Sequence, residues 1–166
     1  MKGVVANNVN LIRFADILLW AAEVEIEIGS LDLAREYINR VRERAGRTSG
    51  WVKNNSGTFA PYAANYHVGQ YPVENWTQEY ARKAVRYERM LELAMEGHRF
   101  FDLVRWEIAD TELGCYLAKE KLNRDYLNNA KFDKGSNEYF PIPQTQIDLS
   151  AGADAIPKMK QNPGYH

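Results

Sequence analysis

The sequence predicts an all-α protein built from stacked helical hairpins of the tetratricopeptide type, with long irregular loops. Three observations predict this class. Apolar residues recur at helical spacing in four segments of the 166-residue chain. Glycines stand where three of those segments stop, and the links within each pair of segments are short. We therefore expect one domain over residues 1–166, with hairpins at about 10–46 and 76–109.

The first hairpin is predicted from two consecutive helical segments. Residues 10–28 contain no Pro or Gly, and Gly29 follows as a natural stop. This segment is apolar nearly all round, so we expect it to be buried on several sides. A second helix is expected at about 32–45, closed by Gly46. The short link between the two helices predicts that they run antiparallel.

Residues 47–75 predict a long aromatic loop, because they hold several Gly and Pro and have no helical period. A structureless loop of this length is usually functional or disordered, and its rings argue against simple disorder. Flat rings pack on the C–H faces of sugars, while neighbouring amides bind hydroxyl groups. The candidate ligand contacts are Trp51, Tyr62, Tyr66, Tyr71 and Asn65. The alternative is that these rings fasten the loop to the helices.

The second hairpin begins at residues 75–78, which resemble a capping box. The third helix should run to Glu96 and stop at Gly97, and a fourth helix at about 99–109 follows almost at once. Beyond it the pattern weakens, so residues 110–166 predict an irregular tail. Within the tail we expect a short helix in 112–127 and one helical turn at 144–149.

Composition excludes several classes of protein. The 21 Lys and Arg against 22 Asp and Glu give a net charge of −1, so no basic excess favours nucleic-acid binding. The mean hydropathy is −0.52 and no run of 18 apolar residues occurs, so no membrane-spanning helix is expected. Cys115 is the single cysteine; it can form no internal disulfide, and we expect it to be buried or half-buried.

A cluster of charged residues follows in the third and fourth segments. Glu88, Glu92 and Glu96 lie at i, i+4 and i+8, with His98 and Asp102 close behind. One hypothesis is a metal site or an acid/base pair for glycoside hydrolysis. The favoured hypothesis is a structural network, in which the carboxylates pair with Arg89, Arg99 and Arg105. No nucleophile motif accompanies His98, so we expect a turn histidine and predict no catalytic residue, metal ligand or cofactor.

Two charges stand on the otherwise apolar first helix, Arg13 and Asp16, one turn apart. They could touch a ligand. We favour a structural role in which they tie this helix to Arg42 and Arg44 or to the tail, because buried charges need charge-assisted partners.

Five motifs in order resemble those of the SusD/RagB family. Residues 13–23 resemble its R-x-A-D-x-L-L-x-x-A-E helix, and 39–46 resemble N-x-V-R-x-R-A-G. Residues 88–106 resemble its most specific signature, E-R-x-x-E-L-x-x-E-G-x-R-x-x-D-L-x-R-W. Residues 141–147 and 161–165 resemble its closing motifs.

This resemblance implies a tetratricopeptide-containing, surface-exposed lipoprotein of the bacterial outer membrane. Such a protein binds glycans or other nutrients, caps a SusC-type TonB-dependent transporter and is not an enzyme. The resemblance also implies that the signature residues mainly hold the fold. These residues are Arg13, Asp16, Glu88, Glu92, Glu96, Arg99, Asp102, Arg105 and Trp106.

Family members are longer than this chain, and their signal peptide and lipid-anchored cysteine precede the motif that begins at Arg13. We therefore expect a C-terminal fragment or a truncated gene product that lacks its own membrane anchor. Because the first helix is so apolar, we also expect this chain to self-associate.

Three functions remain open from the sequence. The leading hypothesis is a nutrient-binding component, for which the near-zero net charge suits a neutral sugar. The alternative is a helical-repeat scaffold that docks a protein and has no small ligand. A hydrolase using Glu88, Glu92 and Glu96 is the third.

Overall fold

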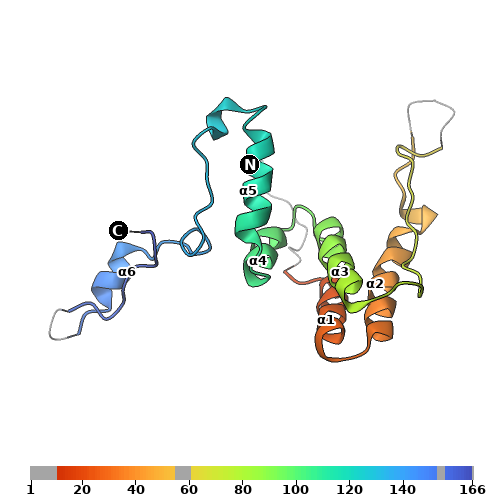
Figure 1. Ribbon diagram of the computed structural model, residues 1–166, viewed down its shortest axis with the longest axis horizontal. Helices are drawn as coiled ribbons and strands as arrows, with labels where there is room; N and C mark the ends of the chain where they lie inside the picture. The colour runs from red at the N-terminus through yellow and green to blue at the C-terminus, as the bar shows by residue number, and fades with distance from the viewer. Residues whose placement is uncertain (1–10, 55–60, 153–155, 166) are drawn as a thin grey trace, which may run out of the picture. The chain divides into compact units, whose positions relative to one another are not determined.

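The computed structural model describes residues 11–54, 61–152 and 156–165 (Figure 1). The chain divides into two compact units, Met1–Gly97 and His98–His166. The described residues are all-α, as the sequence predicts; they form no strand, and their one β-type contact is an isolated antiparallel bridge between Lys53 and Tyr62. A single domain over residues 1–166 stays a prediction.

Three helices build the first unit: α1 (Phe14–Ile28), α2 (Leu31–Ala45) and α3 (Gln78–Glu92). They lie side by side, and a two-residue link joins α1 to α2 (Figure 1). Ser30 caps α2, because its hydroxyl accepts a hydrogen bond from the backbone N–H of Leu33. After α2 a short 3₁₀ turn, Thr48–Gly50, leads into the aromatic loop.

The core of this unit lies where α1, α2 and α3 meet. The apolar side chains that are at most 2% exposed there are Leu19, Ala22, Ile26, Ala34, Ile38, Val41, Ala81 and Val85. These positions follow the helical period of each segment, so each helix turns one face inward.

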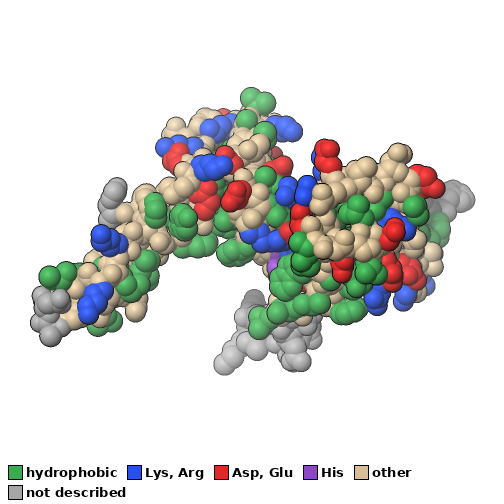
Figure 2. All heavy atoms as spheres, turned by 60° about the horizontal axis from the view of Figure 1, so that its bottom comes forward, with side chains coloured by type: hydrophobic (Ala, Val, Ile, Leu, Met, Phe, Trp, Pro, Cys, Tyr) green, Lys and Arg blue, Asp and Glu red, His purple; other side chains and the backbone are tan. Residues whose placement is uncertain are grey.

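The opposite face of α1 is an exposed apolar stripe. Its residues Ile17, Trp20, Val24 and Ile28 are between 40% and 85% exposed. The expectation that this helix is buried on several sides is wrong for the described residues, because α2 and α3 pack on one side of it. Hydrophobic side chains also stand at the surface between charged ones in Figure 2. Self-association through such a stripe stays a prediction.

The ends of α3 differ from the sequence expectation. Thr77 is the N-cap, and its hydroxyl accepts from the backbone N–H of Tyr80; Asn75 instead has a left-handed backbone, with φ of 60°. The helix ends at Glu92 rather than Glu96, and a turn leads to Gly97, whose φ is 84°. The helix therefore stops one turn before the glycine that signals its end.

The second unit contains α4 (His98–Arg105), α5 (Ala109–Glu120) and α6 (Gln144–Leu149), with a 3₁₀ turn at Asp125–Leu127. α4 and α5 pack together. Cys115 on α5 is exposed, so the expectation that it is buried or half-buried is wrong.

The two closing motifs bind each other in the second unit. The Gln161 amide pairs with the backbone of Ile142, accepting from its N–H at 2.7 Å and donating to its carbonyl at 2.8 Å. The Asn162 amide donates to the Phe140 carbonyl at 2.7 Å. Side-chain amides thus supply the backbone partners that a strand would otherwise provide.

No helix in the described part of the chain is both long enough and apolar enough to span a bilayer.

Candidate functional site

Charged residues from α1, α2 and α3 interlock in the first unit. Arg13, at the N-cap of α1, donates to a Glu92 carboxylate oxygen at 2.8 Å and to both Glu96 carboxylate oxygens at 2.8 Å. It also donates to the Glu92 carbonyl. The hydrogen bond to Glu96 is the main cause that raises the pKa of Arg13 above its ordinary value, and burial opposes it. Arg13 therefore fixes the start of α1 against the end of α3.

Asp16 and Arg89 form a buried ion pair between α1 and α3. Their nearest atoms are 2.7 Å apart, and each side chain is 1% exposed. The Arg89 guanidinium also lies over the Trp20 ring, 5.7 Å from its centroid. Because both charges have left water, the ion pair replaces part of the hydration that each has lost.

Arg42 and Arg44 of α2 complete the network. Arg42 binds Glu88 at 2.8 Å, contacts the Gly69 carbonyl and lies 4.8 Å from the centroid of the Tyr71 ring. Arg44 binds Glu92, which Arg13 also holds. Burial raises the pKa of Glu88, and the hydrogen bond from Arg42 opposes that shift.

These partners differ from those the sequence suggested. Glu88 binds Arg42, Glu92 binds Arg13 and Arg44, and Glu96 binds Arg13, whereas the sequence suggested Arg89, Arg99 and Arg105. Arg13 binds Glu92 and Glu96, and Asp16 binds Arg89 of α3, whereas the sequence suggested Arg42, Arg44 or the tail. Periodicity shows which residues share a face, but it does not show which helix lies opposite that face.

The remaining signature residues lie in the second unit. Asp102 is 4% exposed and binds Arg105 at 3.0 Å, while the Arg105 guanidinium lies 4.8 Å from the Trp106 ring centroid. Arg99 approaches Glu112 at 3.7 Å. His98 begins α4. These contacts are local to this unit.

Acid/base chemistry has little support in this arrangement, because each carboxylate of the Glu88, Glu92 and Glu96 series is held by a guanidinium. Among the described residues, no three His, Cys, Asp or Glu side chains gather in a way that could hold a metal ion.

Three of the predicted ligand residues gather into one ring cluster, which consists of Trp51, Tyr62 and Tyr66. Trp51 stacks on Tyr66 with 4.9 Å between centroids and 24° between planes. Tyr62 meets both rings edge-on, at 5.1 Å and 6.4 Å. All three residues are half-buried, so the cluster is ordered by its own packing and still reaches solvent.

Two anchors hold the ring cluster in place. The Trp51 indole N–H donates to the Ala45 carbonyl at the end of α2, at 3.0 Å. The two arms of the loop then pair as a short antiparallel bridge: the Asn54 N–H donates to the Pro61 carbonyl, and the Ala63 N–H donates to the Val52 carbonyl. This pairing brings residue 62 back beside residue 51.

Tyr71, another predicted ligand residue, packs elsewhere on the helices. Tyr71 packs on Trp76 and Tyr80, at 5.4 Å and 6.0 Å, and Asn39 of α2 makes two hydrogen bonds to its backbone. Tyr71 therefore fastens the end of the loop to the helices, as the alternative interpretation proposed. Asn65 is exposed. Residues 55–60 of the loop, which include Asn55 and Phe59, lie outside the described residues.

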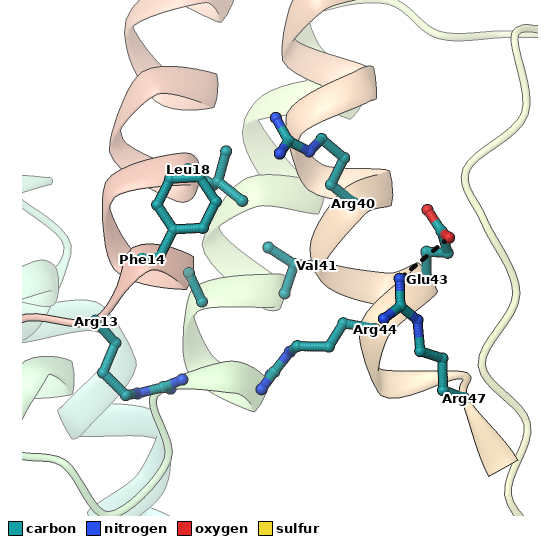
Figure 3. Close-up of a pocket in the computed structure, with 9 residues that line it drawn as sticks. Arg13, Phe14, Leu18, Arg40, Val41, Glu43, Arg44 and Arg47 are labelled. Carbon is teal, nitrogen blue, oxygen red and sulfur yellow. Dashed lines mark ion pairs between the residues drawn. The ribbon is translucent and has the colours of Figure 1, made fainter. Parts of the chain in front are cut away.

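The structure also contains an arginine-lined pocket that the sequence did not predict. It lies between the start of α1 and the C-terminal half of α2, where Arg40, Arg44 and Arg47 follow one another at i, i+4 and i+7 (Figure 3). Arg40 and Arg44 lie one turn apart on α2 and Arg47 follows just after the helix, so the signal was present in the sequence.

Comparison with known proteins agrees with the motifs. The family model described as the SusD family matches residues 1–165. The chain belongs to the SusD family. Two similar curated relatives come from Formosa agariphila: SusD-like protein P25, 35% identical over 103 residues, and SusD-like protein P2, 29% identical over 155 residues. These alignments cover 62% and 92% of this chain.

This SusD-family chain also resembles a solved structure. The crystal structure of a SusD superfamily protein from Bacteroides vulgatus matches with a TM-score of 0.60 and 27% identity, over 93% of this chain and 27% of that one. The chain spans only 16% and 25% of the length of the two curated relatives.

Proposed function

We propose that this chain is part of a glycan-binding, surface-exposed lipoprotein of the outer membrane, which passes nutrients to a SusC-type TonB-dependent transporter. Membership of the SusD family supports the class of protein. The ring cluster supports the ligand class, because Trp51, Tyr62 and Tyr66 are packed together and remain partly exposed.

The ring cluster suits a saccharide for a physical reason. Sugar C–H groups pack on an aromatic face with little loss of side-chain freedom, since these rings already hold one another. Asn65 lies on the same loop and supplies an exposed amide for hydroxyl groups. We propose binding without catalysis, because the acidic residues that could do acid/base work are engaged by arginines.

Calorimetry against a panel of oligosaccharides tests this proposal. Trp51→Ala and Tyr66→Ala should each weaken binding by about tenfold, because each removes a ring face from the cluster. Tyr87→Ala is the matched control, since Tyr87 is a partly exposed tyrosine on α3 outside the cluster. Its affinity should equal that of the unmodified protein. Binding of peptides with no response to any glycan would contradict the ligand class.

Transporter capture separates the proposal from a docking scaffold. A SusC-type transporter should co-purify with the protein from solubilised outer membranes. A scaffold without a small ligand would capture the transporter equally well after Trp51→Ala and Tyr66→Ala and would bind no oligosaccharide at all.

A further inference from the structure

The arginine-lined pocket has the composition of a site for a charged ring. It has a volume of about 470 Å³. Phe14 and Leu18 of α1 and Val41 of α2 give it an apolar floor, as Figure 3 shows. Its polar lining is Arg13, Arg40, Arg44, Arg47 and a single carboxylate, Glu43.

Arg40 carries the excess positive charge of this pocket. Arg13 is neutralised by Glu92 and Glu96, Arg44 also binds Glu92, and Arg47 lies 3.5 Å from Glu43. With Arg40 there are thus four guanidinium groups, and the carboxylates that pair with them are three: Glu43, Glu92 and Glu96. Among the described residues, Arg40 has no carboxylate within ion-pair distance, and its guanidinium lies 5.7 Å from the centroid of the Phe14 ring.

The placement of Arg40 leaves its donors available. A guanidinium offers five N–H donors in a planar fork that fits two oxygens of a carboxylate or a sulfate. The Phe14 ring orients this fork through a cation–π contact and uses none of the donors. Arg44 adds to the site, because its side chain is 56% exposed and its bond to Glu92 uses one nitrogen.

Arg40 also joins this pocket to a second one. The second pocket, about 490 Å³, is also lined by Arg40 and Glu43. Its other charged lining residues are Asp32, Glu36 and Arg35, so three carboxylates stand against two guanidinium groups there. Arg40 therefore lines two hollows, and only the first, where Glu43 is the single carboxylate, suits an anionic group.

We propose that the arginine-lined pocket binds the acidic group of a charged saccharide, a uronate carboxylate or a sulfate ester, with Arg40 as the principal contact. This inference rests on the proposed function, since it names the class of saccharide. It also qualifies the neutral ligand suggested by the net charge of −1, because a local excess at one pocket is independent of the charge of the whole chain.

Matched pairs of saccharides test the inference. Oligogalacturonate and its methyl ester differ in the carboxylate charge, and dextran sulfate and dextran oligosaccharides differ in the sulfate. In at least one pair the acidic member should bind about tenfold more tightly, because hydrogen bonds to a charged group are worth that factor or more. The pair that responds tells carboxylate from sulfate recognition.

Three variants assign the effect to Arg40. Arg40→Gln should reduce binding of the acidic member to that of its neutral partner, and Arg40→Lys should give an intermediate affinity because it keeps the charge without the fork. Lys83→Gln removes the same charge from an exposed position on α3 and should change nothing. An unchanged melting temperature of Arg40→Gln shows that the variant is folded.

The outcomes separate the two proposals. Glycan binding that shows no preference for the acidic member in either pair overturns the inference and leaves the proposed function standing. An acidic preference that Arg40→Gln and Lys83→Gln reduce equally also overturns it, because the effect is then one of net charge. Failure of every saccharide to bind overturns the proposed function, and the inference falls with it.

Discussion

The ion-pair network of α1, α2 and α3 and the ring cluster of the aromatic loop lie in the same unit but use their side chains in opposite ways. In the network, the Asp16 and Arg89 side chains are each 1% exposed and form a buried ion pair. In the ring cluster, Trp51 and Tyr66 are packed and yet remain partly open to solvent. A residue type capable of binding makes a site only where its contacts within the fold leave a face or a donor free.

The largest expected effect comes from breaking the buried pair of the network. Asp16→Asn should lower the free energy of unfolding by about 3–5 kcal/mol, because it removes the carboxylate that pairs with the buried Arg89 guanidinium. Urea unfolding followed by circular dichroism measures this loss.

Glu79→Gln is the matched control for Asp16→Asn. It breaks the ion pair between Glu79 and Lys83. The Lys83 side chain is 73% exposed and the Glu79 side chain is 78% exposed, so stability should hardly change. Equal losses in the two variants would contradict the distinction between buried and exposed pairs.

The next effect concerns the point where the network meets the loop. Asn39→Ala removes both hydrogen bonds to the Tyr71 backbone, at 2.8 Å and 2.9 Å, and should cost about 2 kcal/mol in thermal unfolding. Asn65→Ala removes an exposed amide of the same loop, so it should leave stability within about 0.5 kcal/mol.

These two asparagines also divide the loop by function. Asn65→Ala should weaken oligosaccharide binding, as expected for a ligand contact. If Asn39→Ala unfolds at the temperature of the unmodified protein, the loop does not depend on its anchor at α2.

The sequence predicted the helices well because apolar periodicity and stop residues are local signals. α2 shows this best: Gly46 is its C-cap, and its buried residues Ala34, Ile38 and Val41 keep the helical period. The end of α3 was missed because Leu93, which lies before the expected stop at Gly97, already leaves the helical conformation.

The candidate site was only partly predictable, because its geometry depends on contacts between residues far apart in sequence. The loop composition indicated the rings, but the Lys53–Tyr62 bridge is what unites Trp51, Tyr62 and Tyr66. In the sequence Tyr71 looked equivalent to these three rings. In the structure it is held away from them by the hydrogen bonds that Asn39 of α2 makes to its backbone. The i, i+4, i+7 arginines were visible, but the pocket in front of them needs α1 as its second wall.

The smallest expected effect is a pH dependence inside the network. Burial raises the pKa of Glu88 above 4.5, its ordinary value in an unfolded chain, despite the hydrogen bond from Arg42. The folded protein therefore holds more protons than the unfolded chain between the two pKa values. The stability that Glu88 contributes is fully present below pH 4.5 and is lost as the pH rises through the raised pKa.

Subtracting the free energy of unfolding of Glu88→Gln from that of the unmodified protein isolates this dependence, and the difference should fall as the pH rises from 4 to 8. It should be smaller than the effect of Asn39→Ala. Glu79→Gln should show the opposite sign: Lys83 lowers the pKa of exposed Glu79, so its contribution is lost as the pH falls. The contributions of these two carboxylates to stability would then change in opposite directions with pH, because Glu88 is buried inside the network and Glu79 lies in solvent. Parallel slopes would mean that Glu88 is hydrated, and the network would then resemble the ring cluster in keeping its functional groups open to water.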